Sequence, residues 1–273
     1  VYMVEGRGGT DCSRIRKWAD DAPDEFRELI NLLVETTTTY LTRQVESGAE
    51  IIQLFDSWAG ILNEQQFHRW SVEPTRQIVD RLRESCPGVP LIGFPRDVGP
   101  LAEPFVIDTG IDAISLDHET SLEWIAETLQ PKCTVQGNLD NQVLVEGGEI
   151  LDRETMAILK ALSKGPFIFN LGHGVLPATP PEHVARVAEL VAAADLAVVL
   201  HEDATTTLAG LEVPAAGTLL VVVGPEGGIA PEELDALTAA GATSVRLGAE
   251  VLRTSTAGVA AVAALLSRTS RWA

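Results

Sequence analysis

The sequence predicts an α/β protein built from parallel βα units, arranged either as a doubly wound sheet or as a barrel. Short apolar runs alternate with helical segments along residues 1–190, and this alternation is typical of parallel sheets. From about residue 191 the composition changes to alanine, valine, leucine and glycine. We therefore expect two segments, a larger one over 1–190 and a smaller one over 191–273.

The composition limits the class of protein. The chain has 273 residues, of which 45% are hydrophobic, enough for a substantial core. A formal net charge of −19 argues against a surface that generally attracts nucleic acid or membrane, although it is compatible with a local basic pocket. The three cysteines are widely spaced without a CxxC pattern, which indicates a reducing, cytoplasmic location. No apolar run approaches ~18 residues, so no membrane span is expected.

The first segment begins with VYMVEGRGG, which we interpret as the end of a strand. A long helix is predicted from residue 24, with Gly48 closing it as the C′ residue. Its apolar residues recur at helical spacing, at Phe26, Leu29, Ile30 and Leu33. Residues 36–39 are all threonine, a poor helix former, so tertiary packing must hold that part of the helix.

Five short apolar runs in the first segment are predicted to be parallel strands. They are Ile51–Phe55, Leu91–Phe94, Ala113–Leu116, Cys133–Gln136 and Phe167–Leu171. Each run is followed by polar or glycine-rich residues: DSWAG, PRDVG, DHET, GNLD and GHG in turn. Taken singly, such residues are ordinary turn chemistry. Five together favour a functional site, because in a βα barrel the carboxyl ends of the strands form the catalytic face.

Further helices and strands are predicted along the rest of the chain. TSLE at 120–123 has the pattern of a capping box that opens a helix, and apolar spacing predicts another helix up to about Val191. In the second segment we expect strands at 196–200, 218–223 and 244–247. A helix is predicted over 230–241, and a final small-residue helix reaches Leu266.

Residues 1–190 resemble uroporphyrinogen decarboxylase. The resemblance rests on six stretches that span this segment: YMVEGRGGTD, LFDSWAGIL, VPLIGFPRDVG, AISLD, VQGNLD and FNLGHGVLPATPPEHV. It implies a partial (β/α)8 (TIM-type) barrel that contains the family's later strands, so we expect an open or patched sheet. It also implies conversion of uroporphyrinogen III to coproporphyrinogen III, in porphyrin and heme biosynthesis, by removal of carboxylate from the acetate side chains without a cofactor. The family's opening region, with its substrate-binding arginines, has no counterpart here, so the implied activity is expected to be impaired.

The resemblance implies three pocket residues, Tyr2, Ser57 and His173. Tyr2 and Ser57 would hydrogen-bond a substrate carboxylate, and His173 would do so with charge. Other interpretations stay open: Tyr2 as a terminal residue, Ser57 as a turn cap and His173 as a loop histidine between glycines. Related methyltransferases with the same barrel bind zinc through a His-x-Cys pattern. Gly174 and Val175 follow His173 here, so no metal site is expected.

Residues from about 195 to 273 resemble the C-terminal part of the small-subunit (16S) rRNA uridine N3-methyltransferases, a family of knotted SPOUT methyltransferases. The matching stretches are VVLHEDA, LLVVVGPEGGIAPEEL and VRLGAEVLRTSTA. The resemblance implies a partial SPOUT-like α/β knot segment that holds S-adenosyl-L-methionine in loops after successive strands. Glycines in those loops would let the ligand approach the backbone. The implied cofactor-binding residues are Leu200, Gly224, Glu226, Gly227, Gly228, Leu247, Gly248, Leu252, Arg253 and Thr254.

Some of these residues have a second interpretation. Thr254 could cap a helix instead of contacting a ligand, and Glu226 could be a solvent-facing acid in the first turn of a helix. RNA binding needs cations, yet acids outnumber the arginines of residues 191–273, which are Arg246, Arg253, Arg268 and Arg271. An rRNA partner and a homodimer are expected on the resemblance alone.

The sequence thus looks like a fusion of two fragments, joined near AELVAAADL. Three functions follow as hypotheses. The first is a uroporphyrinogen decarboxylase-like enzyme with a tetrapyrrole substrate. The second is a methyltransferase-like protein that binds S-adenosyl-L-methionine, and the third is a non-catalytic fusion of the two fragments.

Overall fold

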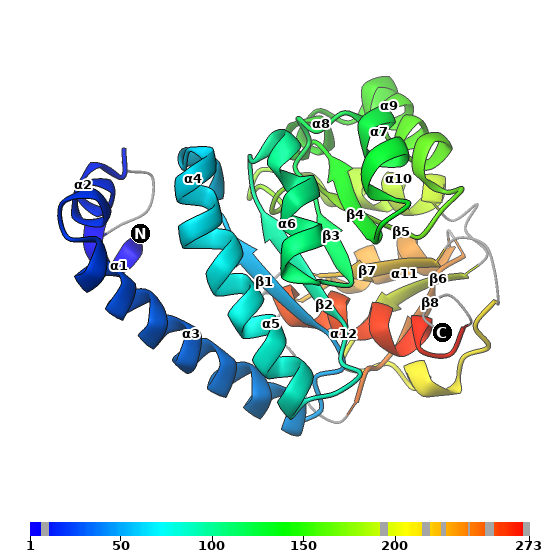
Figure 1. The fold of residues 1–273 in the computed structure, drawn as a ribbon. Coiled ribbons are helices and arrows are strands. Elements are labelled where there is room, and N and C mark those ends of the chain that lie inside the picture. Colours follow the sequence, from blue (N-terminus) through cyan, green and yellow to red (C-terminus); the bar gives the residue numbers. More distant parts are fainter. Residues whose placement is uncertain are drawn as a thin grey trace.

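The computed structural model describes residues 1–6, 11–191, 196–214, 219–224, 228–239, 241–248 and 254–269. Within these ranges the strands form two parallel sheets (Figure 1). The larger sheet contains β1 (Ile52–Asp56), β2 (Leu91–Pro95), β3 (Ala113–Ser115), β4 (Thr134–Leu139) and β5 (Phe167–Leu171). The smaller sheet contains β6 (Leu196–Leu200), β7 (Leu219–Val223) and β8 (Thr243–Val245).

Helices precede, connect and cover these strands. The chain begins with α1 (Tyr2–Glu5), α2 (Ser13–Asp21) and α3 (Pro23–Glu46). The larger sheet is connected by α4 (Glu64–Phe67), α5 (Glu73–Ser85), α6 (Ala102–Thr109), α7 (Leu122–Trp124), α8 (Asn141–Glu146) and α9 (Gly148–Leu162). The smaller sheet is accompanied by α10 (Pro181–Val191), α11 (Pro231–Ala239) and α12 (Thr254–Leu266). Within the described ranges, no helix has both the length and the hydropathy that crossing a bilayer requires.

The larger sheet confirms the five predicted strands. They lie in chain order, β1-β2-β3-β4-β5, and each neighbouring pair is parallel. The register aligns Phe55 with Phe94, and Asn138 with Asn170, so the carboxyl ends of these strands meet at one edge. Hydrogen bonding among the described strands leaves β1 and β5 at the sides of the sheet, which is therefore open there, as expected.

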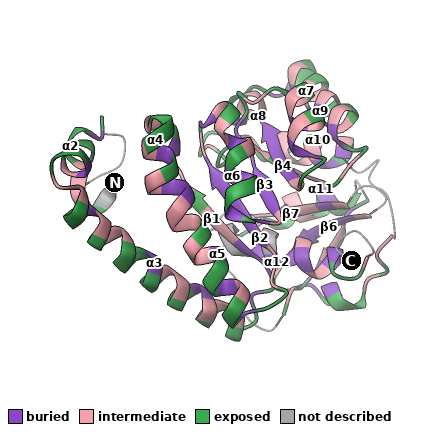
Figure 2. Cartoon of the chain, in the orientation of Figure 1, coloured by how far each residue is buried: buried purple, intermediate pink, exposed green. Residues whose placement is uncertain are grey.

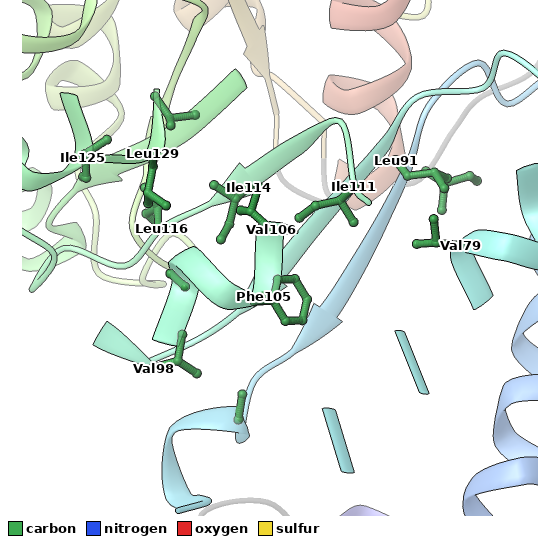
Figure 3. Close-up of a cluster of buried hydrophobic side chains, with 14 of the residues drawn as sticks. Val79, Leu91, Val98, Phe105, Val106, Ile111, Ile114, Leu116, Ile125 and Leu129 are labelled. Carbon is green, nitrogen blue, oxygen red and sulfur yellow. The ribbon is translucent and has the colours of Figure 1, made fainter. Parts of the chain in front are cut away.

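Helices α5, α6 and α9 cover the outer face of the larger sheet. Leu91 and Ile114, from β2 and β3, are buried there in one cluster with Val79 of α5 and Phe105 of α6 (Figure 3). Phe105 reaches the sheet because Gly93 has no side chain: a Cβ at that position would lie 2.7 Å from Phe105 Cε1. The apolar runs of the sequence therefore form strands because burial of their side chains stabilises this layer.

The inner face of the larger sheet is covered at its amino-terminal end by α12, which comes from the second segment. Ala263 of α12 is buried with Ile51, Ile92 and Ala113, and Ile168 of β5 packs against this cluster. Helix α12 also contacts β1 and β7, and it lies alongside both sheets in Figure 1. The two segments thus share one core.

The next layer of side chains on the inner face, two residues along each strand toward the carboxyl ends, is polar. Gln136 Nε2 donates to Ser115 Oγ (3.1 Å) and to Gln53 Oε1 (3.4 Å). Beyond this layer, Phe55 packs edge-to-face on Phe94 with ring centroids 6.0 Å apart. Phe55 is nevertheless 57% exposed. The carboxyl end of the inner face is therefore accessible to solvent, whereas α12 fills the amino-terminal end.

The smaller sheet has the order β7-β6-β8, with both pairs parallel. Its strands confirm the predicted runs, although β8 is shorter than the predicted 244–247. On one face, Val199 packs with Ala188 of α10 and with Leu237 of α11. On the other face, Val198 packs with Ala261 of α12. Helix α12 therefore lies between the two sheets and contributes to the core of each.

The predicted long helix is confirmed as α3, and Gly48 follows it with φ +105°. Buried Phe26, Val34 and Leu41 anchor one side of α3, while much of the helix is exposed or half-buried (Figure 2). Packing on this side holds the helix through its threonine run.

Two local predictions were wrong. The N-terminal residues form helix α1, in which the carbonyl oxygen of Val1 accepts from the N–H groups of Val4 and Glu5. The predicted capping box at 120–123 does not form: α7 is capped by Ser121 without a side-chain hydrogen bond. The Thr120 hydroxyl instead donates to Asp117 Oδ1 (3.1 Å).

The shared core makes a testable prediction. Ala263→Glu should lower the stability of both sheets together by about 3–5 kcal/mol, because it places an unpaired charge in an apolar cluster. Urea unfolding followed by tryptophan fluorescence measures this, since Trp58 and Trp124 report on the larger sheet. The matched control is Ser267→Glu, at an exposed position just beyond α12. An unchanged tryptophan transition in Ala263→Glu would contradict the shared core.

Candidate functional site

Loops after β1 and β2 are tied together at the carboxyl edge of the larger sheet. Arg96 N donates to Asp56 O (3.1 Å), and Gly60 N donates to Arg96 O (2.9 Å). Gly60 permits this approach, because a Cβ there would clash with the carbonyl oxygen of Asp97. Ser57 lies between Asp56 and Gly60, the two residues of its loop that hydrogen-bond the backbone of Arg96.

Asp117, after β3, joins the neighbouring loops. Its Oδ2 accepts from Asp97 N (3.0 Å), and its Oδ1 accepts from Glu119 N (3.2 Å) and Thr120 Oγ1 (3.1 Å). Asp97 has φ +60°, a conformation that non-glycine residues rarely adopt, and the bond to Asp117 offsets part of its cost. From β4, Asn138 Nδ2 donates to the carbonyl oxygens of Asp117 and Thr120, both at 2.9 Å.

The loop after β5 completes this set of contacts. Asn141 Nδ2 donates to Gly174 O (2.8 Å), which links it to the start of α8. Gly172 packs directly on the backbone of His118, because a Cβ on Gly172 would clash with His118 N. His173 is thereby brought to the β3 loop. We call the five linked loops, 56–60, 95–97, 116–120, 138–141 and 171–174, the carboxyl-edge belt.

Charges in the carboxyl-edge belt act on His173. Partial burial lowers the pKa of His173, the positive charge of Arg96 lowers it further, the carboxylate of Asp97 raises it, and His118 lowers it. The imidazole of His173 is therefore favoured in its neutral form at pH 7. His118 Nε2 lies 4.0 Å from Asp140 Oδ2.

Asp56, at the end of β1, carries a carboxyl group enclosed by the protein. Burial raises its pKa, while the hydroxyl of Ser71 and the backbone N–H of Trp58 lower it. Ser71 Oγ donates to Asp56 Oδ2 at 2.6 Å. This carboxyl group therefore fixes the first residues of the loop that bears Ser57.

The structure brings two of the three predicted pocket residues to the same edge. Ser57 and His173 both lie in the carboxyl-edge belt, and His173 is exposed. Tyr2 lies in α1, and its side chain is outside the described part of the chain. Within the described ranges, no group of three or more His, Cys, Asp or Glu side chains is placed to hold a metal ion.

Several functional candidates were not singled out from the sequence. Arg96, Asp117, His118 and Asn138 stand in the polar stretches PRDVG, DHET and GNLD, which were recognised as strand ends. Their individual importance comes from hydrogen bonds and charges between loops that are distant in sequence. In the sequence, the signal that could have pointed to these four residues was their position in the polar stretches after the strands.

The smaller sheet brings its predicted loops to one edge as well. Leu200 is level with Val223 of β7 and with Val245 of β8. Gly224 and Leu247 therefore follow their strands at the same carboxyl edge, with Gly248 next to them. Thr254 begins α12. The predicted residues Glu226, Gly227, Leu252 and Arg253 lie outside the described residues.

Each of the three described glycines in these loops has a different environment. A Cβ on Gly224 would lie 2.5 Å from Ile229 Cγ1, so packing within the protein already requires glycine there. Gly228 has φ +82°, which glycine adopts readily. A Cβ on Gly248 would meet no atom of the described residues within 4 Å.

Comparisons with known proteins find two families along the chain. A model described as RNA methyltransferase domain matches residues 175–266. Among solved structures, the chain is similar to ribosomal RNA small subunit methyltransferase E from Neisseria gonorrhoeae bound to S-adenosyl methionine, with 21% identity and a TM-score of 0.29. That similarity covers 57% of this chain and 65% of that one. Thiamine phosphate pyrophosphorylase from Pyrococcus furiosus is 14% identical, with a TM-score of 0.39, over 83% of this chain and 86% of that one.

Curated relatives match the larger segment. Uroporphyrinogen decarboxylase from Rhodospirillum rubrum is 50% identical over 193 residues, which is 71% of this chain and 56% of the relative. The enzyme of the same name from Paracoccus denitrificans is 45% identical over 191 residues, 70% of this chain and 56% of the relative. The chain thus spans about half the length of these relatives. A model described as uroporphyrinogen decarboxylase (URO-D) matches residues 1–194, and the chain therefore belongs to the uroporphyrinogen decarboxylase family, with an RNA methyltransferase domain match at its C-terminal end.

Proposed function

We propose that this protein is a uroporphyrinogen decarboxylase-like enzyme that binds a tetrapyrrole polycarboxylate at the carboxyl edge of the larger sheet. The carboxyl-edge belt carries this proposal, because its hydrogen bonds hold the loops of Ser57, Arg96 and His173 on one accessible edge. The names of the relatives point to decarboxylation of uroporphyrinogen, and the reaction that we propose is conversion of uroporphyrinogen III to coproporphyrinogen III.

The proposed roles follow from the chemistry of each side chain. Ser57 and Tyr2 hydrogen-bond a substrate carboxylate. His173, neutral when the site is empty, donates a hydrogen bond and gains a proton more readily once a carboxylate lies beside it. No cofactor or metal is part of this reaction.

The proposal includes an architecture and a location. The larger sheet is interpreted as part of a (β/α)8 barrel within residues 1–190, and residues 191–273 as a partial SPOUT-like knot segment. A cytoplasmic location fits the free thiols of Cys86 and Cys133. Burial raises the pKa of Cys133 to about 11, so this thiol is unreactive at neutral pH.

Turnover of uroporphyrinogen III tests the first function. We expect the chain to convert uroporphyrinogen III to coproporphyrinogen III. Chromatography of the oxidised porphyrins measures the products. His173→Ala should lower the rate, because a hydrogen-bond donor to the substrate carboxylate is lost, whereas Val175→Ala, at an exposed position in the same region, should not. Equal rates for His173→Ala and the unaltered chain, or no turnover by the unaltered chain, would refute the proposal.

A second function, binding of S-adenosyl-L-methionine, is supported by the edge of the smaller sheet. Leu200, Gly224 and Leu247 lie at the ends of three adjacent parallel strands, and a Cβ on Gly248 would meet no atom of the described residues within 4 Å. Backbone groups of these residues would hold the cofactor, which supplies an activated methyl group when bound. An rRNA substrate and a homodimer belong to this second proposal.

Isothermal titration with S-adenosyl-L-methionine tests the second function. We expect weak binding that Gly248→Val abolishes, because a Cβ there meets no atom of the described residues within 4 Å and the added side chain would occupy the ligand's space. Gly174→Val is a matched control, since its Cβ also meets nothing within 4 Å but lies at the other sheet. Equal heats of binding from the Gly248→Val variant and the unaltered chain, or no heat from either, would contradict the proposed S-adenosyl-L-methionine site.

A further inference from the structure

We propose that Arg96, His118 and His173 together form a binding subsite for a single carboxylate group in the carboxyl-edge belt. The choice of ligand class rests on the proposed function. The inference adds Arg96 and His118, which the resemblance does not assign, to the residues that contact the substrate.

Arg96 carries a buried donor that lacks an acceptor. Its Nε makes no hydrogen bond within the described part of the chain, although Asp97 Oδ2 lies 3.3 Å away. A buried N–H without an acceptor loses the hydrogen bond that it would make to water. The Arg96 side chain is 30% exposed, so atoms of it other than Nε are open to solvent and to an anion. A carboxylate is a suitable acceptor, since it matches the planar fork of the guanidinium.

Two histidines complete the set of donors. Gly172 packs on the backbone of His118, which places the neighbouring His173 close to the β3 loop. Arg96 and His118 both lower the pKa of His173 and so oppose its protonation. An anion bound among the three side chains would reverse this effect, because it stabilises the imidazolium form.

Nearby acids limit the subsite to one negative charge. Asp97, Asp117 and Asp140 all stand in the belt. Both oxygens of Asp117 accept hydrogen bonds from the protein, and Asp140 Oδ1 accepts from the backbone N–H of Gln142 (2.8 Å). The carboxylates of Asp117 and Asp140 accept hydrogen bonds from the protein, but the negative charge of all three acids still repels anions. A monocarboxylate is therefore favoured over a phosphate dianion.

NMR titration of the His173 imidazole tests the subsite, with indole-3-acetate as the probe because it joins an aromatic ring to one acetate group. We expect the probe to raise the pKa of His173, and we expect uncharged indole-3-acetamide to leave it unchanged. Arg96→Gln should weaken indole-3-acetate binding about tenfold, through loss of a charged hydrogen bond. Arg153→Gln, at an exposed position on α9 outside the belt, should bind normally.

Four results would overturn the subsite: an unchanged His173 titration with the acetate, an equal shift with the acetamide, unchanged affinity in Arg96→Gln, or tighter binding of inorganic phosphate. If Arg96→Gln does not fold, His118→Gln replaces it, with weaker acetate binding again expected and unchanged binding counting against the subsite. The titrations with the indole probes measure binding and not turnover of uroporphyrinogen. A chain that binds the acetate as described but does not convert uroporphyrinogen would therefore contradict the proposed reaction and support the subsite.

Discussion

Burial of α12 against the larger sheet is the contact on which the rest of the fold depends. A parallel sheet of apolar strands needs cover on both faces. Helices α5, α6 and α9 cover the outer face, and Ala263 fills the amino-terminal end of the inner face between Ile51, Ile92 and Ala113. Small side chains let α12 approach this closely. A helix from the part matched by the RNA methyltransferase model thus completes the core of the part matched by the decarboxylase model.

This arrangement separates the end of the larger sheet that α12 stabilises from the end that carries the candidate site. Helix α12 occupies the amino-terminal end, and the polar layer of Gln53, Ser115 and Gln136 lies between it and the carboxyl edge. Beyond that layer, Phe55 is exposed and the carboxyl-edge belt holds Ser57 and His173. The same division is typical of βα folds, in which loops after the strands carry function and the opposite end carries stability.

The strands could be predicted because each is a short apolar run between polar turns. Their ends could not, since β4 continues through Asn138 to Leu139 by pairing with β5, a long-range contact that hydropathy does not encode. Sequence motifs predicted Ser57 and His173 as site residues, whereas the role proposed for Arg96 depends on hydrogen bonds and charges from other loops. The position of α12 was unpredictable for a related reason: its residues are small and apolar on every side, so no stripe indicates a partner.

Native-state hydrogen exchange tests most directly whether the two segments are one folding unit. We predict that the amides of Ile92 in β2 and Val198 in β6 exchange through the same cooperative opening, with equal free energies and equal dependence on denaturant. Both residues are fully buried, and α12 packs next to each. Opening of β6 at markedly lower free energy, while β2 stays protected, would contradict the account.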